Sequence, residues 1–354
     1  MCRFSSWRVR PLVDRRPSIR ARGGSALIRW LIALVLIVAG MTAPVAGVSA
    51  QIPARPERCT IGFYLSDLYD LDTTQRTFGA DVYVWSRCPG ERNALVTADY
   101  LNAVEQDRLL DWNDEAARGR WSTVKLEGVY RQGFDVRNYP FDRHTLRIVL
   151  EEGVDDADTL VYVADAARSR MRAGLTLQGW TLTGYRVIAW PEVYDTAFGD
   201  PNLPANAASR YAHLEMAVDV RRSDVWTFLQ LSFPIFVATA LALLTFLMHD
   251  ENNRYLTPRL SLLAGVLFAL VLNMRAATET VGPTNGLSLL DKMHLLALGL
   301  VLFAVTVAAG WRTLSRRGWP ASRVERWDRR FLGIGGVVYV IGNVSLVALA
   351  AVAG

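Results

Sequence analysis

The chain has 354 residues, of which 51% are hydrophobic, and its length is sufficient for two domains. Its formal net charge of +5 gives no reason to expect nucleic-acid binding, because residues 1–50 hold eight Arg and one Asp and leave the remainder near −2. Apolar residues crowd into positions 30–48 and into nearly everything after Trp226, whereas the segment between has the mixed composition of a soluble domain.

Residues 1–50 have the features of a secretory signal peptide. An Arg-rich head precedes the apolar run from Trp30 to Ala39, and the small residues Val48-Ser49-Ala50 stand before Gln51 as a cleavage site. An uncleaved membrane anchor is the alternative, although the run is short for a span. We therefore expect residues from 51 onward to be exported.

The export of residue 51 onward places Cys59 and Cys88 in an oxidising space. They flank two strand-like runs, Ile61–Tyr69 and Thr77–Trp85. Folding this hairpin at its middle brings the two cysteines opposite each other, which predicts a disulfide. Two cysteines alone are a much poorer indication of a metal site.

Residues 51–225 are predicted to form an all-β sandwich outside the membrane. Short runs of β-branched and aromatic residues are separated by turn residues at the spacing typical of this fold. The runs are Ala80–Trp85, Thr123–Tyr130, His144–Leu150, Thr159–Ala164, Trp180–Ala189 and Tyr211–Val220. The stretch Leu101–Ala117 is the least clear, and a helical turn is possible there.

Residues 226–354 are predicted to be an α-helical transmembrane four-helix bundle. Its spans are 226–248, 259–281, 287–311 and 331–353, and Pro234 is expected to bend the first of them. Four crossings from an exported domain place the third connection inside the cell. That connection carries seven Arg between 312 and 330, which agrees with the positive-inside rule.

The second span has one unusual face. At helical spacing its residues are polar or small at one end, apolar in the middle and charged at the other. They are Ser261, Gly265, Phe268, Leu272, Arg275 and Glu279. Because a charge facing lipid is costly, this stripe is expected either to line a pore or to lie inside the bundle with Arg275 paired to Glu279.

Several segments resemble the pentameric ligand-gated ion channels. GFDVRNYPFDRHTL at 133–146 is similar to their Pro-loop (Cys-loop), and GFYLSDLYDLDTTQRTF resembles the first strand and hairpin loop of bacterial members. LQGWTLTGY resembles the strand before the ligand-capping loop, and RLSLLAGVLF to Asp291-Lys292-Met293 resembles the pore helix, linker and third span. The Pro-loop lacks flanking cysteines, as in bacterial members. The stretch from Trp85 to Leu101 is shorter than usual, and no Trp stands in Glu151–Asp165, which puts part of the ligand-site wall in doubt.

The resemblance implies a cyclic homopentamer in the bacterial inner membrane that passes inorganic ions when a small molecule or a proton acts on the periplasmic domain. It further implies an ion triad of Asp72, Asp142 and Arg222 that couples the domains, although three unrelated surface charges would fit the spacing alone. It also implies that Tyr139-Pro140-Phe141 presses on the linker Gly282–Leu290, which contains Pro283.

A ring of five Phe268 and Leu272 side chains is the expected gate, since an apolar constriction dries the pore; ordinary helix packing is the alternative. Ser261 and Gly265 would then line the inner mouth, and Glu279 the outer. Selectivity is undecided, with a weak lean to anions, because Pro258-Arg259 resembles the Pro-Ala-Arg sequence of anion-selective members and Arg275 favours anions as well.

The ligand site implied by the resemblance lies between subunits, under the loop Pro191–Arg210. Its expected residues are Tyr194, Phe198 and Tyr211, with Tyr83 or Trp85 from the neighbour. Alternatively, Glu105 and Asp107 are proton-sensing or cation-binding groups. Aromatic walls of this kind suit amines, but packing in the sandwich would also account for them.

No motif indicates an enzyme. The chain has no nucleophile motif, no glycine-rich phosphate loop and no HExxH, and its four His form no metal-ligand pattern, so neither catalysis nor a cofactor is expected. A non-conducting membrane receptor or scaffold of the same fold remains the alternative function.

Overall fold

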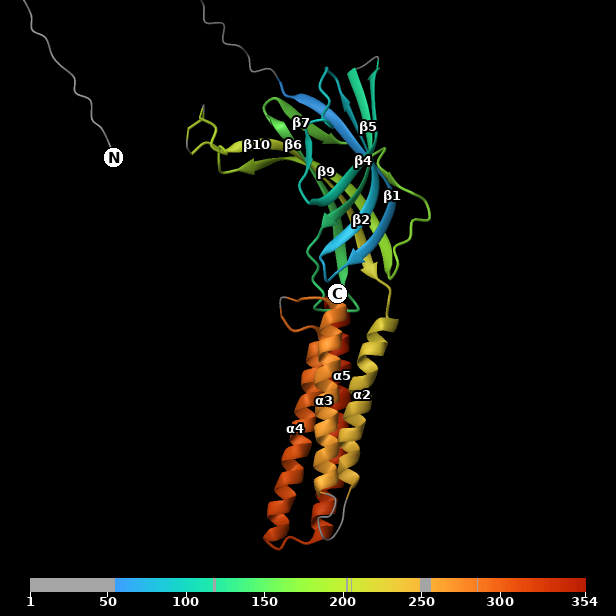
Figure 1. The fold of residues 1–354 in the computed structure, drawn as a ribbon, viewed down its shortest axis with the longest axis vertical. Helices are drawn as coiled ribbons and strands as arrows, with labels where there is room; N and C mark the ends of the chain where they lie inside the picture. The colour runs from blue at the N-terminus through green and yellow to red at the C-terminus, as the bar shows by residue number, and fades with distance from the viewer. Residues whose placement is uncertain (1–54, 117–118, 202, 205, 249–255, 285) are drawn as a thin grey trace, which may run out of the picture. The chain divides into compact units, whose positions relative to one another are not determined.

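The computed structural model describes residues 55–116, 119–201, 203–204, 206–248, 256–284 and 286–354, so the predicted signal peptide lies outside the described residues. Two β-sheets precede four long helices (Figure 1). The strands are β1 Glu57–Asp72, β2 Thr77–Cys88, β3 Ala98–Tyr100, β4 Ala103–Ala116, β5 Gly119–Arg131, β6 Arg143–Asp156, β7 Leu160–Ala164, β8 Arg170–Met171, β9 Trp180–Tyr194 and β10 Ser209–Arg222. Five of the six predicted strand runs lie within these elements, and the sixth, Thr159–Ala164, begins one residue before β7.

One sheet has the order β4-β5-β2-β1-β7, with β8 also paired to β1, and the other has the order β3-β6-β10-β9. Alternate residues of both sheets point into one core, as in β2, where Val82 and Val84 are fully buried. Phe63 and Leu126 from the first sheet share that core with Leu214 of the second. The predicted β-sandwich is therefore confirmed at the level of two sheets that pack on one apolar core.

Strand β4 replaces the helical turn that was possible in Leu101–Ala117. It pairs with β5 from Ala103 to Ala116 as the edge strand of the sheet. Its side chains are mostly exposed, so they carry no alternating pattern by which a strand is recognised. Gly119, which opens β5, has φ +106°, and a Cβ there would lie 2.1 Å from the carbonyl oxygen of Cys88. Only glycine fits this approach.

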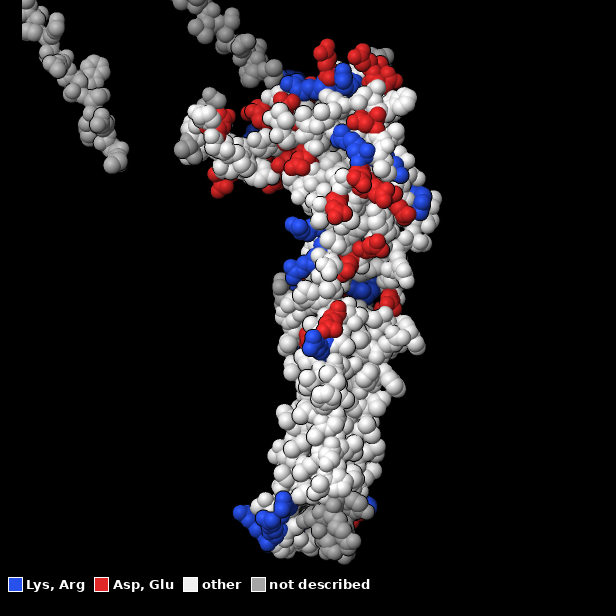
Figure 2. Space-filling model, viewed as in Figure 1, with Lys and Arg blue, Asp and Glu red and all other residues white. Residues whose placement is uncertain are grey.

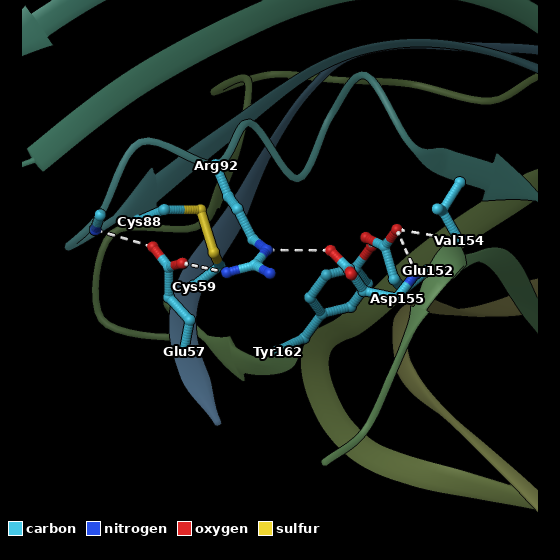
Figure 3. A network of polar contacts seen from close by, with 9 residues as sticks. Glu57, Cys59, Cys88, Arg92, Glu152, Val154, Asp155 and Tyr162 are labelled. Carbon is cyan, nitrogen blue, oxygen red and sulfur yellow. Dashed lines mark hydrogen bonds and ion pairs between the residues drawn. A yellow bond between two sulfur atoms is a disulfide. The ribbon is translucent and has the colours of Figure 1, made fainter. Parts of the chain in front are cut away.

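A disulfide joins Cys59 of β1 to Cys88 of β2, as the hairpin predicted, with Cα atoms 4.2 Å apart. Beside it, Arg92 donates to the carboxylates of Glu57 and Asp155 at 3.2 and 3.0 Å (Figure 3). The disulfide and this bridge therefore connect the start of β1 with the chain after β2 and with the end of β6.

Removing the disulfide is expected to lower the free energy of unfolding by about 3–4 kcal/mol, the loop-closure entropy of a cross-link over the 29-residue separation. The measurement compares the unfolding midpoints of wild type and a Cys59→Ala/Cys88→Ala variant in detergent. Both cysteines are fully buried, so a reductant is expected to leave the native wild type unchanged. Equal midpoints for the two proteins would contradict the prediction.

The four membrane-length helices are α2 Trp226–Leu244, which continues into the short helix η1 Thr245–Leu247, then α3 Leu256–Val281, α4 Leu289–Arg316 and α5 Ala321–Ala353. All four are long and apolar enough to cross a bilayer, which supports a multi-pass membrane protein. Helix α4 starts at a capping box, in which Ser288 and Asp291 satisfy each other's backbone N–H groups. Helix α5 begins ten residues before the predicted span. Its first turns are polar, so the run of apolar residues used for the prediction starts only later in the helix.

Candidate functional site

Two loops of the sandwich contact the helices directly. The hydroxyl of Thr73, in the loop after β1, donates to the carbonyl of Val281 at 2.9 Å. Gly282 adopts φ +98°, and a Cβ added to it would lie 3.0 Å from the carbonyl oxygen of Thr73. In the Pro-loop, the Arg137 carbonyl accepts from the N–H of Leu289 at 2.9 Å. The ends of α3 and α4 are therefore attached to two different loops.

The Pro-loop also packs on α2. Tyr139 and Pro140 are buried and joined by a cis peptide, and the Tyr139 ring lies 6.1 Å from that of Phe228. Phe141 is half-buried against the same helical core, while Pro283 of the linker is exposed. The Pro-loop thus contacts the start of α2 and the start of α4 together.

Asp142 and Arg222 form the ionic centre of this junction. The guanidinium Nε and NH2 atoms of Arg222 donate to the two carboxylate oxygens of Asp142 at 2.8 and 3.0 Å. Its planar face lies 4.1 Å from the ring centroid of Trp180 and 4.8 Å from that of Tyr139. Asp142 is 2% exposed, so the pair is almost fully removed from water.

The third group at this centre is His144 and not the expected Asp72. Its Nε2 lies 2.8 Å from Asp142 Oδ2, and its ring packs between Phe134 and Trp180. Asp72 instead accepts from the backbone N–H groups of Thr74 and Gln75, and it stabilises its own turn. Asp72 was expected from its position in the hairpin loop. His144, in β6, follows Asp142, which stands just before that strand, at the two-residue spacing that lets both side chains point to the same side.

The pKa of the Asp142 carboxyl group is set by its contacts with Arg222 and His144. Burial alone raises it, but the hydrogen bonds from His144 and Arg222 outweigh burial and hold the pKa below the ordinary value of 3.8. A carboxyl group whose pKa is lower in the folded than in the unfolded state stabilises the fold at every pH above its unfolded-state pKa. This stabilisation is lost as the pH falls through the pKa of the folded state.

We therefore expect Asp142→Asn to lower the free energy of unfolding by about 3–5 kcal/mol at neutral pH, because it leaves Arg222 without its buried partner. The gap to wild type should narrow below about pH 4 as the wild-type carboxyl takes up its proton. Unfolding midpoints across this range measure both effects. Asp72→Asn is the matched control, expected to cost less than about 1 kcal/mol because Asn keeps an oxygen that can accept from Thr74 and Gln75. Equal losses in the two variants would contradict the assignment.

The aromatic residues predicted at the capping loop come together. The ring of Tyr194 lies 5.4 Å from Phe198 and 6.2 Å from Tyr211, and the last two are 6.1 Å apart. Phe198 is 62% exposed, so one side of this cluster is open to solvent. The cluster sits at the ends of β9 and β10.

Two polar residues beneath this aromatic cluster, Glu151 and His213, were not predicted from the sequence. The Tyr194 hydroxyl donates to Glu151, at 2.8 Å from Oε2, and the same oxygen lies 3.1 Å from Nδ1 of His213. Burial and the Glu151 carboxylate raise the pKa of Tyr194 to about 12. The Trp190 ring packs against that of His213, with centroids 4.4 Å apart. Trp190 and His213 are a cross-strand pair, so the alternation along β9 and β10 was the signal that could have found them.

Tyr83, Trp85 and Glu105 lie on the other sheet. Tyr83 packs near Tyr64, Trp85 donates to Asp165 at 3.3 Å, and Glu105 is exposed on the edge strand. In the described part of one chain, no ring contact joins these residues to the Tyr194 cluster. They meet that cluster only if a second subunit supplies them.

The unusual face of α3 is exposed along its whole length. Phe268 is 66% and Leu272 52% exposed, and Ser261, Gly265, Arg275 and Glu279 are exposed as well. Leu263, Val266 and Leu270 form the buried face, about half a turn away. Arg275 donates to Glu279 at 2.9 Å, but their side chains are 80% and 66% exposed. The stripe is therefore not buried inside the bundle, although the expected ion pair is present.

Arg259 lies on the buried face of α3, where its guanidinium NH1 is 3.1 Å from Asp328 of α5. Trp311 of α4 donates to the same carboxylate at 2.7 Å. The position that suggested anion selectivity is thus neutralised and turned away from the exposed stripe. The pairing of Arg275 with Glu279 removes the second reason for that lean.

No family model matches this chain, and no curated protein does either. The resemblance therefore depends on the motifs and on the geometry described above. Together these give a β-sandwich-like domain followed by four apolar helices, with two sandwich loops seated on the helix ends.

Proposed function

We propose that the chain is a subunit of a pentameric ligand-gated ion channel of the bacterial inner membrane, with its sandwich in the periplasm. The observation that carries the proposal is the exposed stripe on α3. A Ser, a Gly and a charged pair facing lipid would be costly, whereas five such stripes around an axis would line a pore. A closed ring of identical contacts is an ordinary arrangement for a homo-oligomer.

The junction supports the coupling that such a channel requires. The buried Asp142–Arg222 pair fixes the Pro-loop to the end of β10, from which α2 follows, and Thr73 contacts the end of α3. A displacement of the sandwich loops would therefore reach both helices. The aromatic cluster over Glu151 supports a cationic small-molecule ligand, because both a carboxylate and ring faces attract a positive charge.

The deciding experiment reconstitutes the purified full chain into planar bilayers and counts subunits by imaging in detergent. We expect five subunits and ion current that depends on an added ligand, with amines as the first compounds to screen. The reversal potential under exchange of chloride for a large organic anion then gives the selectivity. An absence of current at any ligand, from a five-membered ring, would favour a non-conducting receptor of this fold.

A further inference from the structure

Two polar side chains meet among the apolar faces of the helices, and we name them the Asn273–His294 hub. The Nδ2 atom of Asn273, on α3, lies 3.0 Å from the backbone carbonyl oxygen of Leu231 on α2 and 3.0 Å from Nε2 of His294 on α4. On the other side of the His294 ring, Nδ1 lies 2.8 Å from the carbonyl oxygen of Leu290. Two side chains thus join three helices.

The hub lies in the apolar interior of the bundle. His294 is fully buried, and Asn273 continues the buried row of α3 that contains Leu270 and Ala277. On the face that Figure 2 shows, the helices are almost free of charged side chains between their two ends. Inside a bilayer there is no water to bond with, so each polar group needs a partner within the protein. The hub is therefore a specific contact between helix faces that are otherwise apolar.

The three hydrogen bonds can be made together in only one protonation state of His294. The carbonyl oxygen of Leu290 can only accept, so Nδ1 carries a proton. The carbonyl oxygen of Leu231 can only accept as well, which directs the NH2 group of Asn273, and not its oxygen, toward this site. Because an NH2 group can only donate, Nε2 is an unprotonated acceptor. His294 is therefore neutral, with its proton on Nδ1.

The contact with α2 is made near a weak point of that helix. Leu231 stands three residues before Pro234, which has no backbone N–H and interrupts the hydrogen-bond ladder of α2. A helix interrupted in this way can bend there, and its direction then depends on contacts with its neighbours. The Asn273 amide supplies such a contact from α3.

We propose that the Asn273–His294 hub positions the gate by fixing the rotation of α3 against α2 and α4. Consecutive residues of a helix point about 100° apart, so an Asn273 side chain held in the bundle directs its neighbour Leu272 to the exposed stripe. Asn273 and His294 are thus positioning residues that act through Leu272. This role rests on the proposed channel function, whereas the hydrogen bonds of the hub do not.

Nitrogen NMR on the full chain in lipid bilayers, with isotope label in histidine only, tests the protonation state. We expect the His294 signals, identified by their absence in His294→Gln, to show a protonated Nδ1 and an unprotonated Nε2 at neutral pH. A role in packing alone would not select this tautomer. A proton on Nε2, or on both ring nitrogens, would overturn the proposal.

A double-mutant cycle on unfolding midpoints measures the bond between the two side chains without reference to ion flow. For Asn273→Leu and His294→Leu we expect a coupling of about threefold or more in the unfolding equilibrium constant, as for other hydrogen bonds between membrane helices. Asn343→Leu is the matched control, because the Nδ2 atom of Asn343 donates to the carbonyl of Tyr339 in its own helix. Equal coupling of His294 to Asn273 and to Asn343 would contradict the hub.

Cysteine accessibility in vesicles tests the positioning itself. Leu272→Cys and Val271→Cys are made one at a time and treated with a charged, water-soluble thiol reagent. In the described part of the chain Cys59 and Cys88 are joined in a disulfide, so the introduced thiol is the free one. With the hub intact, we expect Leu272→Cys to react faster than Val271→Cys, because only the former faces water in a pore.

Variants of the hub should change this ratio of rates according to their hydrogen bonds. His294→Gln places an amide oxygen near the Nε2 position and can still accept from Asn273, whereas His294→Asn reaches only the Nδ1 position. We expect Asn273→Leu and His294→Asn to lower the ratio about threefold or more, and His294→Gln and Asn343→Leu to keep it.

The outcomes separate this proposal from the channel function. A ratio that is unchanged in Asn273→Leu, or that falls as far in Asn343→Leu, would overturn the positioning role. Equal rates for Leu272→Cys and Val271→Cys in otherwise wild-type protein would show that the stripe lines no pore, and the channel function and the positioning role would both fail. The tautomer and the double-mutant cycle then still decide whether the hub joins the three helices.

Discussion

Replacing either member of the buried Arg259–Asp328 pair by Leu is expected to lower the free energy of unfolding by about 3–5 kcal/mol, and replacing both is expected to cost much less. The side chains are 6% and 1% exposed, so Asp328→Leu leaves a buried guanidinium without this carboxylate, and Arg259→Leu leaves a buried carboxylate without this guanidinium. The double variant removes both charges and fills the space with apolar atoms, so its main remaining cost is the hydrogen bond that Trp311 donates to Asp328 in wild type.

A double-mutant cycle on unfolding midpoints in mixed detergent measures this coupling. Arg275→Leu/Glu279→Leu and its single variants form the matched cycle, since that pair has similar geometry at 2.9 Å but is exposed. We expect a coupling below about 1 kcal/mol there, as for other surface pairs. A buried pair that couples no more strongly than the exposed one would show that Arg259 does not tie α3 to α5.

The burial of Arg259 could not be predicted from the sequence. Its position before a pore-like span suggested a charge at the inner mouth of the pore. Sequence spacing does not tell which face of a helix is buried when the packing partners are unknown, so the burial of Arg259 was not foreseen. The partner is Asp328, 69 residues away, among the arginines of residues 312–330. A long-range pair of this kind leaves no local pattern, so only the fold could reveal it.

Features with a local cause were predicted well. The spans follow from runs of apolar residues, and the disulfide follows from a hairpin of two recognisable strands. Strand β4 was missed because its stability comes from pairing with β5 and not from its own residues. At the junction, the Asp142–Arg222 contact followed from motif positions, whereas the part played by His144 depends on how β6 packs against Trp180.

Leu272→Ser is expected to raise resting ion flux at least tenfold if five copies of this side chain close the pore. Transferring one Leu side chain out of apolar surroundings changes the free energy by about 1.5–3 kcal/mol, and each 1.4 kcal/mol is a factor of ten in an equilibrium constant. A hydroxyl at this level favours water in the constriction, and a wetted constriction conducts. Phe268→Ser should act in the same direction.

Val271→Ser is the control that separates a gate from ordinary packing. Val271 is 51% exposed and Leu272 is 52%, so the two residues are equally available to a lipid or a neighbouring helix. They point about 100° apart on α3, and only Leu272 lies in the stripe with Phe268 and Arg275. Tracer flux from vesicles without ligand should therefore rise for Leu272→Ser and stay low for Val271→Ser. If both variants leak equally, the side chains act through packing, and the stripe on α3 does not define the pore.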